Sequence, residues 1–218
     1  MRSLLFDLDG TLVDSRAVVE RQWRRLCERL GLNFAEMLAV LHGVRSVDVI
    51  RAFAPGVDVE AEAAALDAAE QVDTAGLKVV PGAPAVLAGL PPGSWAIVTS
   101  GHRTLAQGRL RAVGLPVPDV MVCGDEVARG KPDPEGYLRA LALLDAARAP
   151  APPYAPDGIW VVEDSTAGVL AARAAGMRVV ALRTPAYDPG LAPAELIAER
   201  LDEALATRLF SLDGASAA

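Results

Sequence analysis

Four short apolar runs, separated by stretches with helical spacing, restrict the fold of this chain more than any other feature. The runs are WAIVTS (95–100), DVMVCG (119–124), GIWVVED (158–164) and MRVVALR (177–183). Helical patterns lie between them, at residues 102–113, 134–147 and 166–176. Strands that alternate with helices of this length are joined by right-handed crossovers and pair in parallel. The sequence therefore predicts an α/β protein built on a parallel sheet, with 177–183 as its last strand.

A further strand is predicted at residues 4–8, because all of these residues except Asp7 are apolar and Gly10 soon follows them. The chain then changes to helical spacing, and no second strand is expected before residue 78. The helical pieces are 15–30, 34–41, 45–53 and 58–75. We therefore expect a doubly wound, Rossmann-like core formed by residues 1–14 and 78–218, with an inserted α-helical cap domain formed by residues 15–77.

Composition agrees with a compact body of this size. The chain has 218 residues, of which 52% are hydrophobic and 22% are charged. That length suits a core with one insertion, and that composition supplies a buried core rather than a disordered chain. Cys27 and Cys123 lie in apolar patterns without a CxxC neighbour, so we interpret them as small buried hydrophobes rather than as a disulfide or a metal pair.

The charge and hydropathy of the chain argue against two classes of partner. The formal net charge is −7, whereas proteins that bind nucleic acid generally show a basic patch. No apolar run approaches the roughly 18 residues that a membrane span requires, and the N-terminus lacks a basic region followed by an apolar signal core. We therefore expect a cytoplasmic protein, a monomer or weak dimer, that binds neither nucleic acid nor a membrane.

Two aspartates in the stretch FDLDGTLVDS (6–15) lie at the end of the first predicted strand. Asp7 and Asp9 are two residues apart, so an extended backbone places both side chains on one side of the strand. Two carboxylates that close repel each other unless a cation lies between them. The stretch therefore predicts a cation-binding site at this end of the sheet.

Polar residues also follow the other predicted strands, although the strands themselves are almost entirely apolar. These residues are Thr99 and Ser100 after the strand at 95–100, Lys131 in the loop GKPDP, and Glu163 and Asp164 at the end of GIWVVED. Ligands of parallel sheets bind beyond the carboxyl ends of the strands, so we expect these side chains to lie near the first two aspartates.

Lys131 is unusual in this chain, because only two of the 21 lysine and arginine residues are lysines. A lysine in a tight loop of glycine and proline offers a compact charge that suits a phosphate oxygen. A solvated surface lysine is the alternative interpretation.

Four motifs, taken in order, resemble those of the haloacid dehalogenase-like superfamily of hydrolases. They are DLDGT (7–11), Thr99-Ser100-Gly101 after a hydrophobic strand, the lysine of GKPDP, and VVEDS. The pieces LHGVRSVDVIRAFAP (41–55), VPGA (80–83) and WAIVTSG (95–101) resemble a subgroup of that superfamily. The subgroup is the sugar- and polyol-phosphate phosphatases, including those named for 2-deoxyglucose-6-phosphate and glycerol-3-phosphate, in the branch related to β-phosphoglucomutase.

The resemblance implies a Mg²⁺ site, which a phosphate ester needs if it is to approach a carboxylate. Two like unit charges at about 4 Å repel by about 4 kcal/mol at an effective dielectric constant of about 20. Asp7, Asp164 and the backbone carbonyl of Asp9 are the implied ligands, and Glu163 is implied to hold one of these ligands or to reach the ion through a water.

The same resemblance assigns the chemistry to two aspartates. Asp7 would attack phosphorus and form an aspartyl-phosphate, while Asp9 would protonate the leaving alkoxide and later take a proton from water. Lys131 and Thr99 would hold the phosphate oxygens, and the backbone N–H groups of Gly10 and Ser100 would add donors.

Substrate selection is expected to come from the cap and from the loop after residue 99. The predicted substrate-binding residues are Ser15, His42, Arg45, Ser100 and Gly101. A loop histidine or a helix-start arginine can equally serve as a helix cap or a solvated contact.

Three other functions compete with phosphate hydrolysis. A phosphosugar mutase of the same family would share the core chemistry, but the related mutases carry a histidine at the cap hinge where Val19 stands here. A dehalogenase needs no acid at the position of Asp9. A phospho-accepting receiver-type signalling protein, which is not an enzyme, has its paired acids on the first strand and a basic output domain.

The predicted function is Mg²⁺-dependent hydrolysis of a small phosphorylated metabolite, a sugar or polyol phosphomonoester, through an aspartyl-phosphate intermediate. The mutase and the receiver protein remain the alternatives.

Overall fold

The computed structural model describes residues 3–189 and 192–211. A six-stranded parallel sheet with the order β5-β4-β1-β6-β7-β8 forms its centre. The strands are β1 (Leu4–Phe6), β4 (Trp95–Val98), β5 (Val120–Val122), β6 (Trp160–Glu163), β7 (Arg178–Leu182) and β8 (Leu196–Ala198). Because β1 lies between β4 and β6, the order of the strands reverses at β1. The predicted α/β class and doubly wound parallel sheet are confirmed.

The prediction that 177–183 is the last strand is wrong. β8 follows β7 and pairs with it in parallel, with Val180 opposite Leu196. β8 has only three residues, so its sequence is too short to show a strand period.

Helices cover both faces of the sheet, as a parallel sheet requires. Leu4 and Phe6 of β1 belong to one apolar cluster and Leu5 to the other. The first cluster is covered by α5 (Ala83–Ala88), α6 (Arg103–Ala112) and α9 (Glu203–Ser211), and the second by α7 (Glu135–Ala147) and α8 (Thr166–Ala174). Short 3-10 turns follow β5 at Gly124–Glu126 and precede β6 at Pro156–Gly158. The short helix α5 was not predicted.

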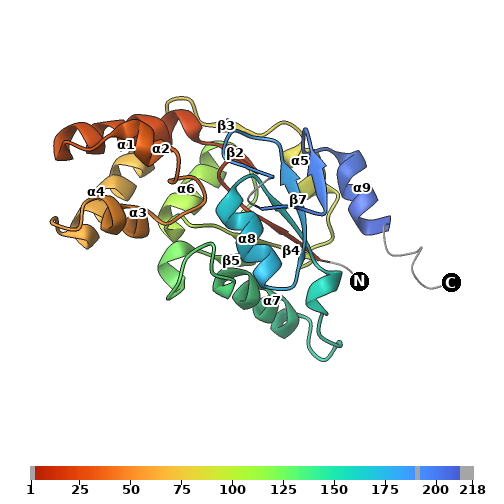
Figure 1. Ribbon diagram of the computed structural model, residues 1–218. Helices are drawn as coiled ribbons and strands as arrows, with labels where there is room; N and C mark the ends of the chain where they lie inside the picture. The colour runs from red at the N-terminus through yellow and green to blue at the C-terminus, as the bar shows by residue number, and fades with distance from the viewer. Residues whose placement is uncertain (1–2, 190–191, 212–218) are drawn as a thin grey trace.

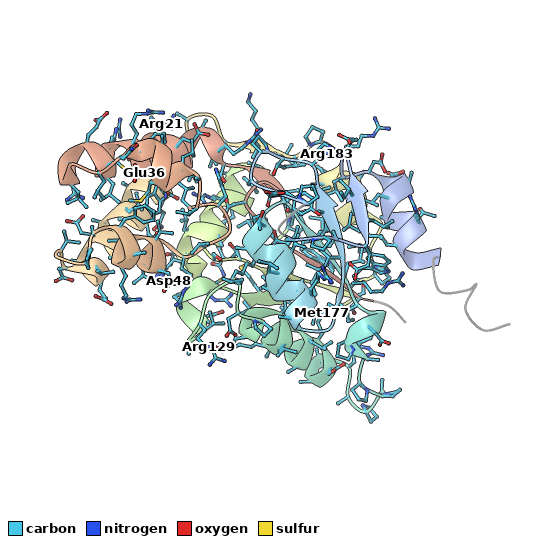
Figure 2. All side chains as sticks on the ribbon, viewed as in Figure 1. Arg21, Glu36, Asp48, Arg129, Met177 and Arg183 are labelled. Carbon is cyan, nitrogen blue, oxygen red and sulfur yellow. The ribbon has the colours of Figure 1, made fainter. Side chains whose placement is uncertain are left out.

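The predicted helical pieces form a separate group at one end of the molecule (Figure 1), here called the helical insertion. It consists of α1 (Arg16–Leu30), α2 (Phe34–Leu38), α3 (Ser46–Phe53) and α4 (Val59–Val72). These helices pack around their own apolar cluster, which contains Trp23, Met37 and Ile50. Figure 2 labels Arg21, Glu36 and Asp48 on the insertion, apart from Met177 and Arg183, which directly precede and follow β7.

Two chain segments connect the insertion to the sheet, and they pair with each other. β2 (Val13–Asp14) and β3 (Lys78–Val79) are antiparallel, with Asp14 opposite Lys78. The prediction that no strand lies between β1 and residue 78 is therefore wrong, because β2 is a strand of two residues. Both connections pass through this one ribbon, which lies at the predicted borders of the insertion.

The structure also describes the two cysteines and the length of the helices. Cys27 and Cys123 are buried and free, as predicted. Within 3–189 and 192–211, every helix is too short or too polar to cross a lipid bilayer.

Candidate active site

The polar residues predicted to meet at the carboxyl end of the sheet do meet there. Asp7 directly follows β1, and Glu163 and Asp164 stand at the end of β6, its neighbour. One carboxylate oxygen from each of the three lies within 4.8 Å of the other two, and all three side chains are buried. The pairing of β1 with β6 therefore brings these three acids together at the ends of the two strands.

Glycine makes this close approach feasible. Gly10 has φ +95°, and a Cβ at this position would lie 1.9 Å from Asp164 Oδ2. A Cβ at Gly168, in the first turn of α8, would lie 1.7 Å from Glu163 Oε1. No other residue type fits at either position without moving an acid of the cluster.

Lys131 supplies the cation of the cluster. Its Nζ donates hydrogen bonds to Asp7 Oδ1 at 2.6 Å, to Glu163 Oε1 at 2.6 Å and to the carbonyl of Val98 at 2.9 Å. Burial acts to lower the pKa of Lys131, but Asp7 and Glu163 outweigh it and raise that pKa above the usual value. Lys131 is thus a buried ammonium and not the solvated lysine of the alternative interpretation.

One ammonium does not balance three buried carboxylates. Burial raises the pKa of Asp7 to about 8, although Lys131 acts against the shift. Burial, and then the charges of Asp7 and Glu163, raise the pKa of Asp164 well above its usual value. The cluster therefore has the electrostatic character of a site for a further cation.

The donor set fits Mg²⁺, which prefers carboxylate and carbonyl oxygens. Both oxygens of Glu163 are already engaged: Oε1 by Lys131 and Tyr137, and Oε2 by the N–H groups of Asp164 and Ser165 and the Ser165 hydroxyl. Among the residues that the structure describes, Asp164 Oδ1, in contrast, accepts only a long contact of 3.4 Å from the Thr11 hydroxyl. Asp7 and Asp164 therefore have more free acceptor capacity for an ion than Glu163 has.

A cavity of about 410 Å³ opens between the sheet and the helical insertion. Of the predicted site residues, Asp7, Asp9, Ser15, His42, Thr99, Ser100, Gly101 and Asp164 line it. Lys131 and Glu163 lie behind Asp7 rather than on the wall. The insertion also contributes Trp23 and Val19, so the cavity has apolar as well as polar walls.

His42 and Ser100 line the cavity from its two sides, His42 from the loop after α2 and Ser100 from the loop after β4. Burial lowers the pKa of His42, so its imidazole is neutral at pH 7. The Ser100 hydroxyl donates to the carbonyl of Gly43, at 2.7 Å, and so joins the loop after β4 to the loop after α2.

Arg45 is not placed where the sequence predicts. It does not line the cavity, and its guanidinium bonds to Asp48 and to the carbonyls of Gly124, Val127 and Ala128. Those carbonyls belong to the sheet part of the chain, so Arg45 ties the insertion to it. The sequence shows that an arginine lies at the start of a helix. It does not show whether that side chain contacts the cavity or the neighbouring loop of the sheet part of the chain.

Arg109 and Glu70 line the cavity and were not predicted. Arg109 of α6 donates to Asp9 Oδ1 at 2.7 Å and to Glu70 Oε2 of α4 at 2.5 Å. The sequence pattern could have indicated both residues, because each is a charged residue on the apolar face of its helix. Arg109 shares that face with Leu110, and Glu70 shares it with Leu66. A charged residue on a buried helix face needs a partner.

Known proteins are similar to this chain in sequence and in fold. The sequence model for haloacid dehalogenase-like hydrolases matches residues 1–176. The chain is 41% identical to hexitol phosphatase A of Escherichia coli over 215 residues, which cover 95% of this chain and 94% of that protein. It is 36% identical to 2-deoxyglucose-6-phosphate phosphatase 1 of Saccharomyces cerevisiae over 204 residues, 84% and 80% of the two chains.

Among solved structures, β-phosphoglucomutase from Clostridium difficile superimposes with a TM-score of 0.78 over 96% of this chain and 97% of that one. At 17% identity this likeness concerns the fold alone. The two relatives above, in contrast, are similar in sequence over 95% and 84% of this chain. The protein is therefore a member of the haloacid dehalogenase-like hydrolase family, as its four strand-end motifs predicted.

Proposed function

We propose that this hydrolase is a Mg²⁺-dependent phosphatase of small phosphorylated sugars or polyols, with Asp7 as nucleophile. The observation that carries the proposal is the position of Asp7, which faces the cavity on one side and is held from behind by Lys131. The names of the relatives, a hexitol phosphatase and a 2-deoxyglucose-6-phosphate phosphatase, support the substrate class.

Asp7, Asp164 and the backbone carbonyl of Asp9 would hold the Mg²⁺, and Glu163 would orient the cluster through its own hydrogen bonds. When bound, the ion offsets the negative charge of the phosphate group and of the attacking carboxylate. This agrees with the surplus of buried acid over Lys131.

Asp7 and the groups around it carry out the nucleophilic attack, bind the phosphate oxygens and transfer protons. The Asp7 carboxylate attacks phosphorus and becomes an aspartyl-phosphate. The Thr99 hydroxyl and the N–H groups of Gly10 and Ser100 donate to the phosphate oxygens. Asp9 gives its proton to the leaving alkoxide and takes one from the water that hydrolyses the intermediate. Asp9 is suited to this exchange because its side chain keeps 25% of its exposure and lines the cavity.

We propose that residues 15–77 act as the cap domain of a core formed by residues 1–14 and 78–218. The separate apolar cluster of the insertion and its attachment through the β2–β3 ribbon support this division. Ser15 and His42 would then contact the sugar or polyol part of the substrate, beside Ser100 and Gly101. Cytoplasmic location and a monomeric or weakly dimeric state stay predictions.

A mutase is the second candidate for this fold. A mutase must keep its reaction intermediate in the site and phosphorylate it again, and the related mutases carry a histidine at the cap hinge. Val19 occupies that place here and lines the cavity with an apolar side chain. Hydrolysis is therefore the better supported reaction.

The first prediction concerns metal and substrate class. The purified protein is expected to release phosphate from hexitol phosphates, 2-deoxyglucose 6-phosphate and glycerol phosphate, and excess EDTA is expected to stop this release until Mg²⁺ is restored. A colorimetric phosphate assay with nucleoside monophosphates as the comparison class measures both effects. Turnover that persists in EDTA contradicts the metal assignment, and preference for nucleotides contradicts the substrate class. Isomerised sugar phosphate after glucose-bisphosphate activation would favour the mutase.

A further inference from the structure

Arg109 is a buried arginine that touches the proposed acid–base residue. Its side chain is 4% exposed, and it lies in the middle of α6 among the apolar residues Leu105, Ala106 and Leu110. Nη1 donates to Asp9 Oδ1 at 2.7 Å, and Nη2 donates to Glu70 Oε2 at 2.5 Å. Arg109 and Asp9 are 100 positions apart in the sequence, so only the tertiary fold brings them together.

Glu70 extends this contact into the helical insertion. It belongs to α4, and its side chain is 6% exposed. Asp9, Arg109 and Glu70 thus form a row of three charges that runs from the catalytic end of β1, through α6, to α4. The position of the Asp9 carboxylate therefore depends on groups from both sides of the cavity.

Packing alone does not account for an arginine here. Within the described part of the chain, Arg109 Nε is buried and has no hydrogen-bond partner. An apolar side chain in the same stripe would leave no unsatisfied nitrogen, whereas a buried charge pair is generally a weak source of stability. The hydrogen bonds to the carboxylates of Asp9 and Glu70 are therefore the interactions that distinguish arginine from an apolar residue at this position.

Arg109 contacts one of the two carboxylate oxygens of Asp9, and this contact affects which of the two oxygens carries a proton. Arg109 binds only Oδ1, and no described residue donates to Oδ2, which lies at the cavity wall beside Gly101. An arginine is always a donor and never an acceptor. When Asp9 is in its acid form, the donor on Oδ1 therefore favours the proton on Oδ2, the oxygen that is free to reach the leaving group.

We infer that Arg109 is a positioning residue of the phosphatase reaction: it holds Asp9 with the proton-bearing oxygen toward the substrate, and Glu70 anchors Arg109 from the insertion. The inference rests on the proposed function, because it assumes that Asp9 transfers a proton to the leaving alkoxide. A purely structural role, in which the pair only joins α4 to α6, predicts different kinetics.

The test compares substrates that differ in their need for acid help. A p-nitrophenolate leaves readily without a proton, whereas an alkoxide does not. Arg109→Gln is expected to lower kcat/KM for glycerol phosphate about 10- to 100-fold more than kcat/KM for p-nitrophenyl phosphate. Arg109→Lys, which keeps a donor and a charge, should recover part of this difference. Equal losses for both substrates would overturn the inference and leave the structural role.

A double-mutant cycle shows whether Arg109 acts through Asp9. In an Asp9→Asn background, Arg109→Gln is expected to change kcat/KM for glycerol phosphate less than about 2-fold, because the group that it positions is already inactive. A full additional loss in that background contradicts the inference.

Matched controls exist on the same two helices. Within the described residues, the Arg111 side chain of α6 bonds only Gln107 at the surface, and Glu60 of α4 is exposed. Arg111→Gln and Glu60→Gln should therefore leave kcat/KM for both substrates unchanged. Should Arg109→Gln fail to fold, Glu70→Gln keeps the arginine and decides the question: about 3-fold or more selective loss with glycerol phosphate supports the inference, and no selectivity contradicts it. If the wild-type protein releases no phosphate, the proposed function fails first.

Discussion

Asp7→Asn is expected to lower kcat/KM for a polyol phosphate by about 10,000-fold or more, because an amide does not attack phosphorus and no other group takes its place. Asp164 belongs to the acidic cluster proposed to hold Mg²⁺, and both oxygens of Glu163 are engaged in hydrogen bonds. The amide has the size of the carboxylate, and its oxygen still accepts from Lys131. Activity should therefore be lost while the fold is kept, which phosphate release and urea unfolding measure together.

Asp157→Asn is the matched control for this variant. Asp157 is exposed in the 3-10 turn before β6, far from the catalytic end of that strand, and the same change of charge there should leave turnover unaffected. More than about a tenth of wild-type turnover in Asp7→Asn would show that Asp7 is not the nucleophile.

Lys131→Met is expected to have the largest effect on stability. Methionine is close to lysine in size but carries no charge, so Asp7 and Glu163 would stay buried without their shared ammonium. Removing one partner of a buried ion pair costs about 3–5 kcal/mol in free energy of unfolding. Phosphate release should also fall about 1,000-fold or more, because the Asp7 nucleophile loses the ammonium that holds it from behind.

The chain offers a control for this change in its other lysine. Lys78 is exposed at the start of β3, so Lys78→Met should shift the free energy of unfolding by less than about 0.5 kcal/mol. Mg²⁺ is expected to recover part of the stability of Lys131→Met, since a divalent ion offsets the same carboxylates, but not its activity. If urea unfolding shows the two lysine variants to be equally stable, Lys131 does not balance the acidic cluster.

The core of the fold and the centre of the site could be predicted because their signals are local. Apolar runs such as WAIVTS reveal buried strands without reference to the rest of the chain. The rule that parallel sheets bind ligands at their carboxyl ends then places Asp7, Glu163 and Asp164 together. The helical insertion was predicted for the same reason, since its period changes at residue 15 and again at 78.

The parts that were not predicted depend on contacts between distant segments. Arg45 reaches carbonyls about 80 positions away, and Arg109 joins Asp9 to a residue of another helix. Spacing along one helix shows which face is buried, but not what lies opposite that face. β8 was missed for another reason, because three residues that complete the edge of a sheet carry almost no pattern of their own.

Trapping of the covalent intermediate tests most directly whether buried acids and a divalent ion let Asp7 attack a phosphate ester. Asp9→Ala, incubated with p-nitrophenyl phosphate and Mg²⁺, is expected to accumulate the intermediate, since phenolate leaves without acid help but hydrolysis lacks its base. After an acid quench and digestion, mass spectrometry should find the phosphoryl group on the peptide that contains Asp7. When EDTA is present during the incubation, this peptide should carry no phosphoryl group. A phosphoryl group on another residue, or equal labelling without metal, would contradict this mechanism.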